Sequence, residues 1–181
     1  MINFKKLRQF LTKNERNKVY LRKNKRSARL VADNKLKTKS ILNKAGINVP
    51  RLIVKFRNVG ELDKFKWEVL EGNFVVKPSM GYGGDGIIVV RRRGKYAGEW
   101  VRMDGSIVTT QDLIRHCHEI LVGKYSLHNI SDSVIVEERI KIHPMFLSIT
   151  KAGTPDIRVI IYNRVPVMAM FRIPTEKSGG K

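Results

Sequence analysis

The segment that decides the fold is Phe74–Val90, with the sequence FVVKPSMGYGGDGIIVV. An apolar run ends at Lys77-Pro78, four glycines follow within six residues, and a second β-branched run begins at Ile87. This order predicts a strand, a glycine-rich loop and a second strand. Glycines allow backbone N–H groups to approach an anion closely, and Lys77 adds a positive charge at the base of the loop. The segment therefore predicts a nucleotide-binding hairpin with ATP as its ligand. The alternative is a glycine-rich turn that binds nothing.

The surroundings of the loop exclude three familiar phosphate-binding motifs. The spacing Gly81-x-Gly83-x-x-Gly86 matches the dinucleotide fingerprint, but that motif continues into a helix, whereas Ile87–Val90 has the composition of a strand. A protein kinase would also need His-Arg-Asp and Asp-Phe-Gly, and the chain contains neither. A Walker A loop is excluded because no Gly-Lys-Ser/Thr follows the glycines.

The charge of the chain is concentrated at its N-terminal end. Residues 1–44 hold 15 Lys and Arg against Glu15 and Asp33, so +13 of the total net charge of +20 lies there. Such a segment favours an anionic partner, and nucleotide, RNA, acidic peptide and anionic lipid all remain open. Cys117 is the only cysteine, which excludes an intrachain disulfide and fits a reducing compartment. No apolar run approaches the roughly 20 residues that span a bilayer, so a cytoplasmic protein without membrane contact is expected.

Periodicity and turn residues predict an α+β fold, with helices packed on mixed or antiparallel sheet. Helices are expected near Phe4–Leu11, from Lys35 to Ala45 with Asp33 or Asn34 as N-cap, from Gly60 to Leu70, and after Thr109 or Thr110. Residues 13–29 are expected to be a solvated or partly disordered arm, and Gly94–Gly105 a connection with little regular structure. Besides the glycine hairpin, strands are expected at Arg51–Phe56, Ser133–Ile142, Asp156–Tyr162 and Pro166–Ile173, the last two as an antiparallel hairpin.

Three groups of polar residues are considered as functional sites, and two of them are kept as candidates. Glu137 and Glu138 end an apolar strand, where a carboxylate or the backbone could read the edge of a base, unless both are solvated. Asp156 and Arg158 share one strand face and Arg172 lies on the next strand; they could line a site for ribose and phosphate or form an exposed ion pair. The third group, His116-Cys117-His118, is rejected as a metal site because helical residues two apart point in nearly opposite directions.

Taken in order, these segments resemble the ATP-grasp superfamily, specifically the alpha-L-glutamate ligase-like proteins related to the ribosomal-protein glutamate ligase. The resemblance covers nearly the whole chain. It is carried by the DNKLKTK run at 33–39, AGINVP at 45–50, the VKP of the hairpin, VEE at 136–138, PDIR at 155–158 and PVMAMFRIPT at 166–175. The order of the set is more specific than any single motif.

The resemblance implies a role for each candidate residue. Lys35 and Lys77 would contact the phosphates, Gly83 and Gly84 would cover them as a flap, and Asp156 would bind the ribose hydroxyls. Glu137, Glu138 and Ile140 would form the adenine hinge. Arg158 and Arg172 would act in catalysis, clamping an acyl phosphate. Such enzymes phosphorylate a carboxylate with ATP and Mg²⁺ and then let an amine attack, although the carboxylate and amine substrates stay unidentified.

The resemblance also predicts how the chain is divided. Residues 1–32 would form a basic helix or arm, and residues 33–181 an ATP-grasp domain with an incomplete C-terminal lobe. The family's magnesium ligands would follow residue 181, so no metal-binding residue is predicted within this chain. The expected function is an ATP-dependent carboxylate–amine ligase, whose activity in this fragment is left open. Two alternatives stay open: a nucleic-acid-binding protein that uses residues 1–44, which is not favoured, and an ATP-binding relic without catalysis.

Overall fold

The computed structural model describes residues 12–81, 83–126, 130–150 and 153–175. Contacts divide the chain into two compact units, Met1–Val49 and Pro50–Lys181. The helix predicted near Phe4–Leu11 lies outside the described residues. No helix among the described residues is long and apolar enough to cross a membrane.

The first unit is helical. Its elements are α2 (Lys13–Glu15), a π-helical turn (Arg16–Tyr20), a 3-10 turn (Leu21–Lys23), α3 (Arg26–Ala32) and α4 (Lys35–Lys44). The segment 13–29, expected to be a solvated or partly disordered arm, consists largely of short helical turns and α3, and residues 17–30 are all exposed. The predicted start of α4 is confirmed: Asn34 is the N-cap, and its Oδ1 accepts a hydrogen bond from the Lys37 N–H at 3.0 Å.

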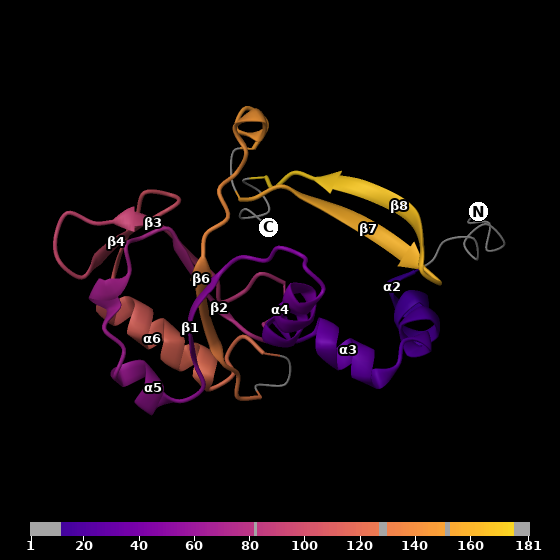
Figure 1. The fold of residues 1–181 in the computed structure, drawn as a ribbon, viewed down its shortest axis with the longest axis horizontal. Coiled ribbons are helices and arrows are strands. Elements are labelled where there is room, and N and C mark those ends of the chain that lie inside the picture. Colours follow the sequence, from indigo (N-terminus) through magenta and orange to yellow (C-terminus); the bar gives the residue numbers. More distant parts are fainter. Residues whose placement is uncertain (1–11, 82, 127–129, 151–152, 176–181) are drawn as a thin grey trace, which may run out of the picture. The chain divides into compact units, whose positions relative to one another are not determined.

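The second unit contains a six-stranded antiparallel sheet in the order β1-β6-β2-β3-β4-β5 (Figure 1). The strands are β1 (Leu52–Phe56), β2 (Phe74–Pro78), β3 (Ile88–Arg93), β4 (Glu99–Arg102), β5 (Ile107–Thr109) and β6 (Val134–Glu138). The predicted strand–loop–strand arrangement is therefore present as β2 and β3, which pair antiparallel with Val76 opposite Ile88. Strand β6 inserts between β1 and β2, which places the Glu137–Glu138 pair beside the glycine hairpin.

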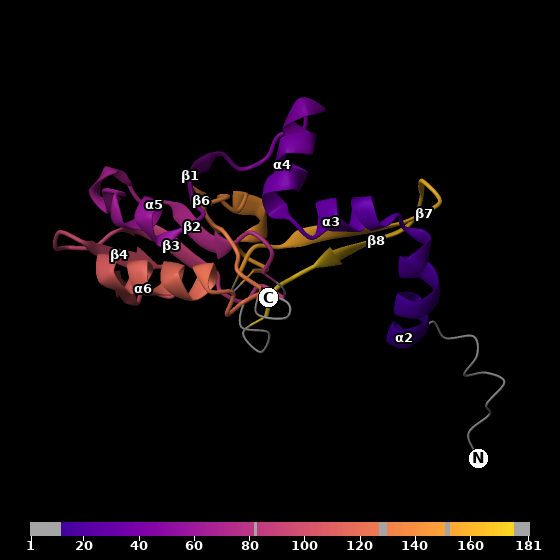
Figure 2. The same cartoon turned by 90° about the horizontal axis from the view of Figure 1, so that it is seen from below.

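Two helices pack with this sheet around one hydrophobic core. Helix α6 (Thr110–Leu121) contacts β2, β5 and β6, and α5 (Val59–Asp63) contacts α6 and β1 (Figure 2). The core joins residues of both helices to the strands that face them: Leu62, Leu113, Cys117 and Ile120 with Phe74, Val76, Val90, Val134 and Val136. The predicted start of α6 is confirmed, because Thr109 forms a capping box with Asp112.

Three boundaries differ from the sequence prediction. The helix expected over Gly60–Leu70 stops at Asp63, and a short 3-10 turn follows at Trp67–Val69. The rings of Phe56 and Trp67 each pack edge-on against Phe65, with centroids 5.3 and 5.4 Å away, and this cluster is incompatible with one continuous helix. Gly94–Gly105, expected to be irregular, contains β4, whose Trp100 is buried against Phe74. The strand expected over Ser133–Ile142 ends at Glu138.

A separate two-stranded sheet is formed by β7 (Asp156–Tyr162) and β8 (Val165–Arg172). The predicted antiparallel hairpin is confirmed, and its turn residues Asn163 and Arg164 have φ of 50° and 67°. Positive φ at both central residues is the geometry of a type I′ turn, whose twist matches that of the strands. Every residue of the two strands is exposed.

Candidate nucleotide-binding site

The sheet brings Lys77 and Glu137 together. Val75 lies opposite Glu137 and Lys77 opposite Ile135, so Lys77 and Glu137 are diagonal neighbours on one face of the β2–β6 pair. The Lys77 ammonium donates to Glu137 Oε1, and the two side chains are only 17% and 5% exposed. An ammonium has three N–H groups, so Lys77 can donate to a second anion besides Glu137. The Glu137 carboxylate meanwhile compensates the positive charge of the buried ammonium.

Glu138 points to the opposite side of β6, as its position next to Glu137 requires. Its carboxylate accepts the Arg51 N–H at 2.8 Å and lies 3.7 Å from the Arg51 guanidinium. The Glu138 N–H donates to Arg51 O, and the Arg139 N–H donates to Asn73 O. The segment expected to be the adenine hinge is therefore hydrogen-bonded on either side to Arg51 and Asn73, the residues that directly precede β1 and β2. Ile140, the last predicted hinge residue, is exposed.

The glycine turn between β2 and β3 presents exposed backbone. Gly83 and Gly84 have φ of 64° and 83°, a left-handed conformation that residues with a Cβ rarely adopt. Both are exposed, as a loop that closes on phosphates would require. A glycine turn therefore joins β2 and β3, whereas its role as a flap that covers a nucleotide is a proposal.

The base of this loop is held by Asp132, which the sequence analysis missed. Asp132 is buried, and its carboxylate accepts the Met80 N–H at 2.8 Å and the Ser133 N–H at 2.6 Å. The Ser79 N–H donates to Ser133 O at 2.9 Å. These bonds extend the β2–β6 pairing past Pro78 and fix the chain where it enters the loop. Nothing in the local sequence marks this role of Asp132, because Met80 lies 52 residues away.

The far end of the loop is held by α6 and the turn that follows it. His116 Nε2 lies 2.9 Å from Gly86 O, and the ring of Tyr125 packs against Gly86. The sequence analysis considered His116 only as a metal ligand and rejected it. Its role in the structure is instead to hold the turn at Gly86.

The remaining predicted residues lie on other elements. Asp156 and Arg172 are directly opposite in the β7–β8 hairpin and form a bidentate ion pair, with Arg172 Nε 2.7 Å from Asp156 Oδ1. The Arg172 hydrogen bonds lower the pKa of Asp156, but the pair is nearly half exposed, so its contribution to stability is small. Arg158 lies opposite Met170 on the same face. Lys35 is the first residue of α4 in the first unit.

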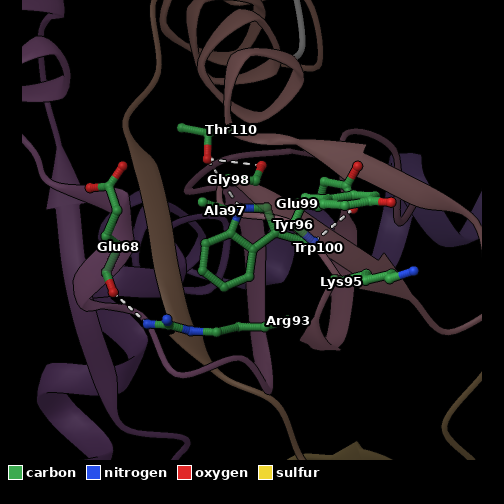
Figure 3. Close-up of a pocket in the computed structure, with 10 residues that line it drawn as sticks. Glu68, Arg93, Lys95, Tyr96, Ala97, Gly98, Glu99, Trp100 and Thr110 are labelled. Carbon is green, nitrogen blue, oxygen red and sulfur yellow. Dashed lines mark hydrogen bonds between the residues drawn. The ribbon is translucent and has the colours of Figure 1, made fainter.

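A small depression of about 280 Å³ lies at the β3–β4 connection, away from the Lys77–Glu137 pair (Figure 3). Figure 3 shows the Arg93 side chain extended beneath Trp100 toward the Glu68 carbonyl. The Arg93 Nε also donates to Leu70 O at 3.0 Å, and Trp100 Nε1 donates to Thr110 Oγ1 at 3.3 Å. Arg93 and Trp100 thus use these polar groups within the fold, and none of the predicted site residues lines the depression.

The chain matches the family model "Sugar-transfer associated ATP-grasp" over residues 14–181. It therefore belongs to the ATP-grasp superfamily, and within it to this sugar-transfer associated family. ATP is accordingly its expected nucleotide. No curated protein and no solved structure shows significant similarity to the chain.

Proposed function

We propose that the protein is an ATP-dependent ligase that activates a carboxylate as an acyl phosphate and joins it to an amine. Membership of the ATP-grasp superfamily supports the use of ATP. The observation that carries the site is the buried Lys77–Glu137 pair, which lies on β2 and β6 next to the exposed glycine turn. The proposal that the reaction forms a C–N bond is based on the sequence resemblance to glutamate ligases.

In this proposal the chain binds and orients ATP with three elements of the sheet. Lys77 contacts the α- and β-phosphates, and the N–H groups of Gly83 and Gly84 cover the phosphates. The strand end at 137–140 receives the adenine, with backbone groups reading its edge. Positioned charges of this kind are the main source of catalysis in phosphoryl transfer, because the transferred group needs neutralisation rather than covalent assistance.

The residues of the other elements complete the proposed site. Asp156 would bind the ribose, and Arg158 and Arg172 the acyl phosphate. The γ-phosphoryl group would pass to the carboxylate oxygen, releasing ADP; attack by the amine would then form the amide and expel phosphate. Because Arg172 already pairs with Asp156, both roles require this exposed pair to rearrange when ligands bind.

Magnesium normally accompanies ATP in this superfamily, but the described residues do not fit a site held by the protein. They contain no cluster of three candidate ligands, and the Glu137 carboxylate is engaged by Lys77. Mg²⁺ prefers carboxylate oxygens together with phosphates and water. No step of the proposed mechanism is therefore assigned to a metal held by these residues.

The test is a calorimetric titration of MgATP into the full chain and its Lys77→Ala variant. The substitution is expected to weaken binding by about 1.5–3 kcal/mol, the usual worth of a charge-assisted hydrogen bond. Lys64→Ala and Lys23→Ala are matched controls, since both remove one exposed positive charge without touching the sheet. Equal losses in all three variants would contradict the site and indicate diffuse electrostatic attraction.

A second variant separates the effect of an added charge from that of backbone strain. Gly84→Asp places a carboxylate in the exposed turn and is expected to weaken MgATP binding more than Gly84→Asn, which strains the backbone similarly at a φ of 83° but adds no charge. Ligase activity is then tested by ADP release with pairs of carboxylates and amines. The family description links these domains to sugar transfer, so amino sugars and uronic acids belong in the screen beside glutamate and its peptides.

A further inference from the structure

The glycine turn is held from outside the hairpin by a small polar cluster on α6 and the turn after it. We propose that His116 and Tyr125, oriented by Glu119, are positioning residues that fix the turn at Gly86 and so set the affinity for ATP without touching the nucleotide. The inference deepens the proposed function and rests on it.

The first contact is a hydrogen bond with a defined direction. His116 Nε2 lies 2.9 Å from Gly86 O, and a carbonyl oxygen only accepts, so Nε2 carries the proton. The other nitrogen, Nδ1, faces Tyr125 Oη at 3.4 Å and Glu119 Oε2 at 3.9 Å. The imidazole is only 13% exposed, and burial lowers its pKa, which favours the neutral ring with its proton on Nε2.

The second contact is steric. Gly86 has a φ of 72°, and a Cβ added there would lie 2.6 Å from Cγ of the Tyr125 ring. Only glycine therefore fits between the turn and this ring, for reasons of both conformation and space. The ring in turn is held by its hydroxyl, which donates to Glu119 Oε2 at 2.5 Å, while Lys124 Nζ binds Glu119 Oε1 at 2.7 Å.

These contacts fix the C-terminal end of the loop at Gly86, just as Asp132 fixes its N-terminal end at Met80. Met80 is bound to the buried Asp132, two residues before β6, and Gly86 is bound to His116 of α6, so each stem of the loop is attached to the body of the sheet unit. The exposed Gly83 and Gly84 lie between the two attachment points. If the turn were not held in place, its backbone N–H groups would have to be ordered when the nucleotide binds. The entropic cost of that ordering would lower the affinity for ATP.

The experiment measures MgATP affinity and unfolding midpoint together for the full chain. His116→Ala is expected to weaken ATP binding roughly tenfold, the loss typical of one hydrogen bond. It should also speed amide exchange in the peptide containing residues 83–86. His116→Gln retains an N–H donor and is expected to restore most of the affinity. His118→Ala, two residues further on the same helix, is the matched control and should bind like the wild type.

A double substitution tests the steric contact. Gly86→Ala and Tyr125→Ala should each weaken binding, and the double variant should lose less than the sum of the two, because the smaller side chain at 125 makes room for the new methyl group. If the wild type binds ATP and His116→Ala binds equally well with unchanged exchange in the turn, the inference is wrong while the proposed function stands. If the wild type shows no saturable binding, both fall.

Discussion

At the scale of single residues, the buried Lys77–Glu137 pair has two consequences that can be separated. It places a cation beside the glycine turn, and it leaves a carboxylate in the sheet that must stay paired. Removing one partner of a buried ion pair leaves the other charge buried without compensation. The resulting loss of stability is usually much larger than the net contribution of the intact pair. Stability and nucleotide binding therefore respond differently to single and double substitutions here.

We expect Lys77→Ala to lower the free energy of unfolding by about 3–5 kcal/mol, because it leaves the Glu137 carboxylate buried without its cation. The double variant Lys77→Met, Glu137→Leu should recover most of this loss, since it removes both charges and fills similar volume. Urea unfolding of the wild type, both singles and the double measures the coupling. A double variant as unstable as the sum of the singles would show that the two charges do not compensate each other.

Residues whose partners are near in sequence were predictable, and residues with distant partners were not. The Asn34 and Thr109 caps were both among the predicted positions, because a cap acts on an N–H three residues away. Lys77 was singled out by its place before the glycines. Asp132 and His116 were missed in their structural roles, since their partners Met80 and Gly86 lie 52 and 30 residues away.

At the scale of elements, α6 links the sheet to the glycine turn, and its first turn is stabilised by the Thr109–Asp112 capping box. The Thr109 hydroxyl and N–H both donate to the Asp112 carboxylate, at 2.7 and 3.0 Å. These bonds lower the pKa of Asp112 from its ordinary 3.8. The helix that carries His116 thus begins at a locally encoded cap.

We expect Thr109→Ala to lower the free energy of unfolding by about 1 kcal/mol at neutral pH, and Thr109→Asn to cost much less, because Asn also caps helices well. A depressed carboxyl pKa stabilises the fold above the ordinary pKa, and that stabilisation is lost as pH falls through the folded-state value. The difference between the wild type and Thr109→Ala should therefore shrink below about pH 4. Urea unfolding at pH 7 and pH 3.5 measures it; a constant difference would contradict the linkage.

The elements also show where prediction from pattern fails. The predicted helix at Gly60–Leu70 has helical spacing, but packing among Phe56, Phe65 and Trp67 ends it early. Strand β4 was missed because it is only four residues long and lies between Gly94 and Gly105, and its pairing with β3 and β5 is not visible locally. The β7–β8 hairpin was found because its alternation and turn are both local.

At the scale of the whole molecule, the uneven charge predicts two kinds of anion binding with different salt dependence. Of the net charge of +20, +13 lies in residues 1–44, and the side chains of residues 17–30 are exposed. Polyanions bound by such a segment release counterions, so the logarithm of their affinity falls linearly with the logarithm of salt concentration. A site that holds one nucleotide through Lys77 and backbone N–H groups should depend on salt far less.

We therefore expect weak binding of a single-stranded oligonucleotide to fall steeply between 50 and 200 mM salt, on the order of tenfold or more. Removing Lys25 and Arg26 together, both exposed in the basic segment, should reduce the slope by about 1.4, which is roughly 0.7 for each phosphate that is no longer neutralised. Lys77→Ala should leave this slope unchanged while weakening MgATP binding. Fluorescence anisotropy at four salt concentrations measures the slope. If the oligonucleotide slope responded to Lys77 and not to Lys25 and Arg26, polyanions would bind at the nucleotide site, and the basic segment would have no role in binding.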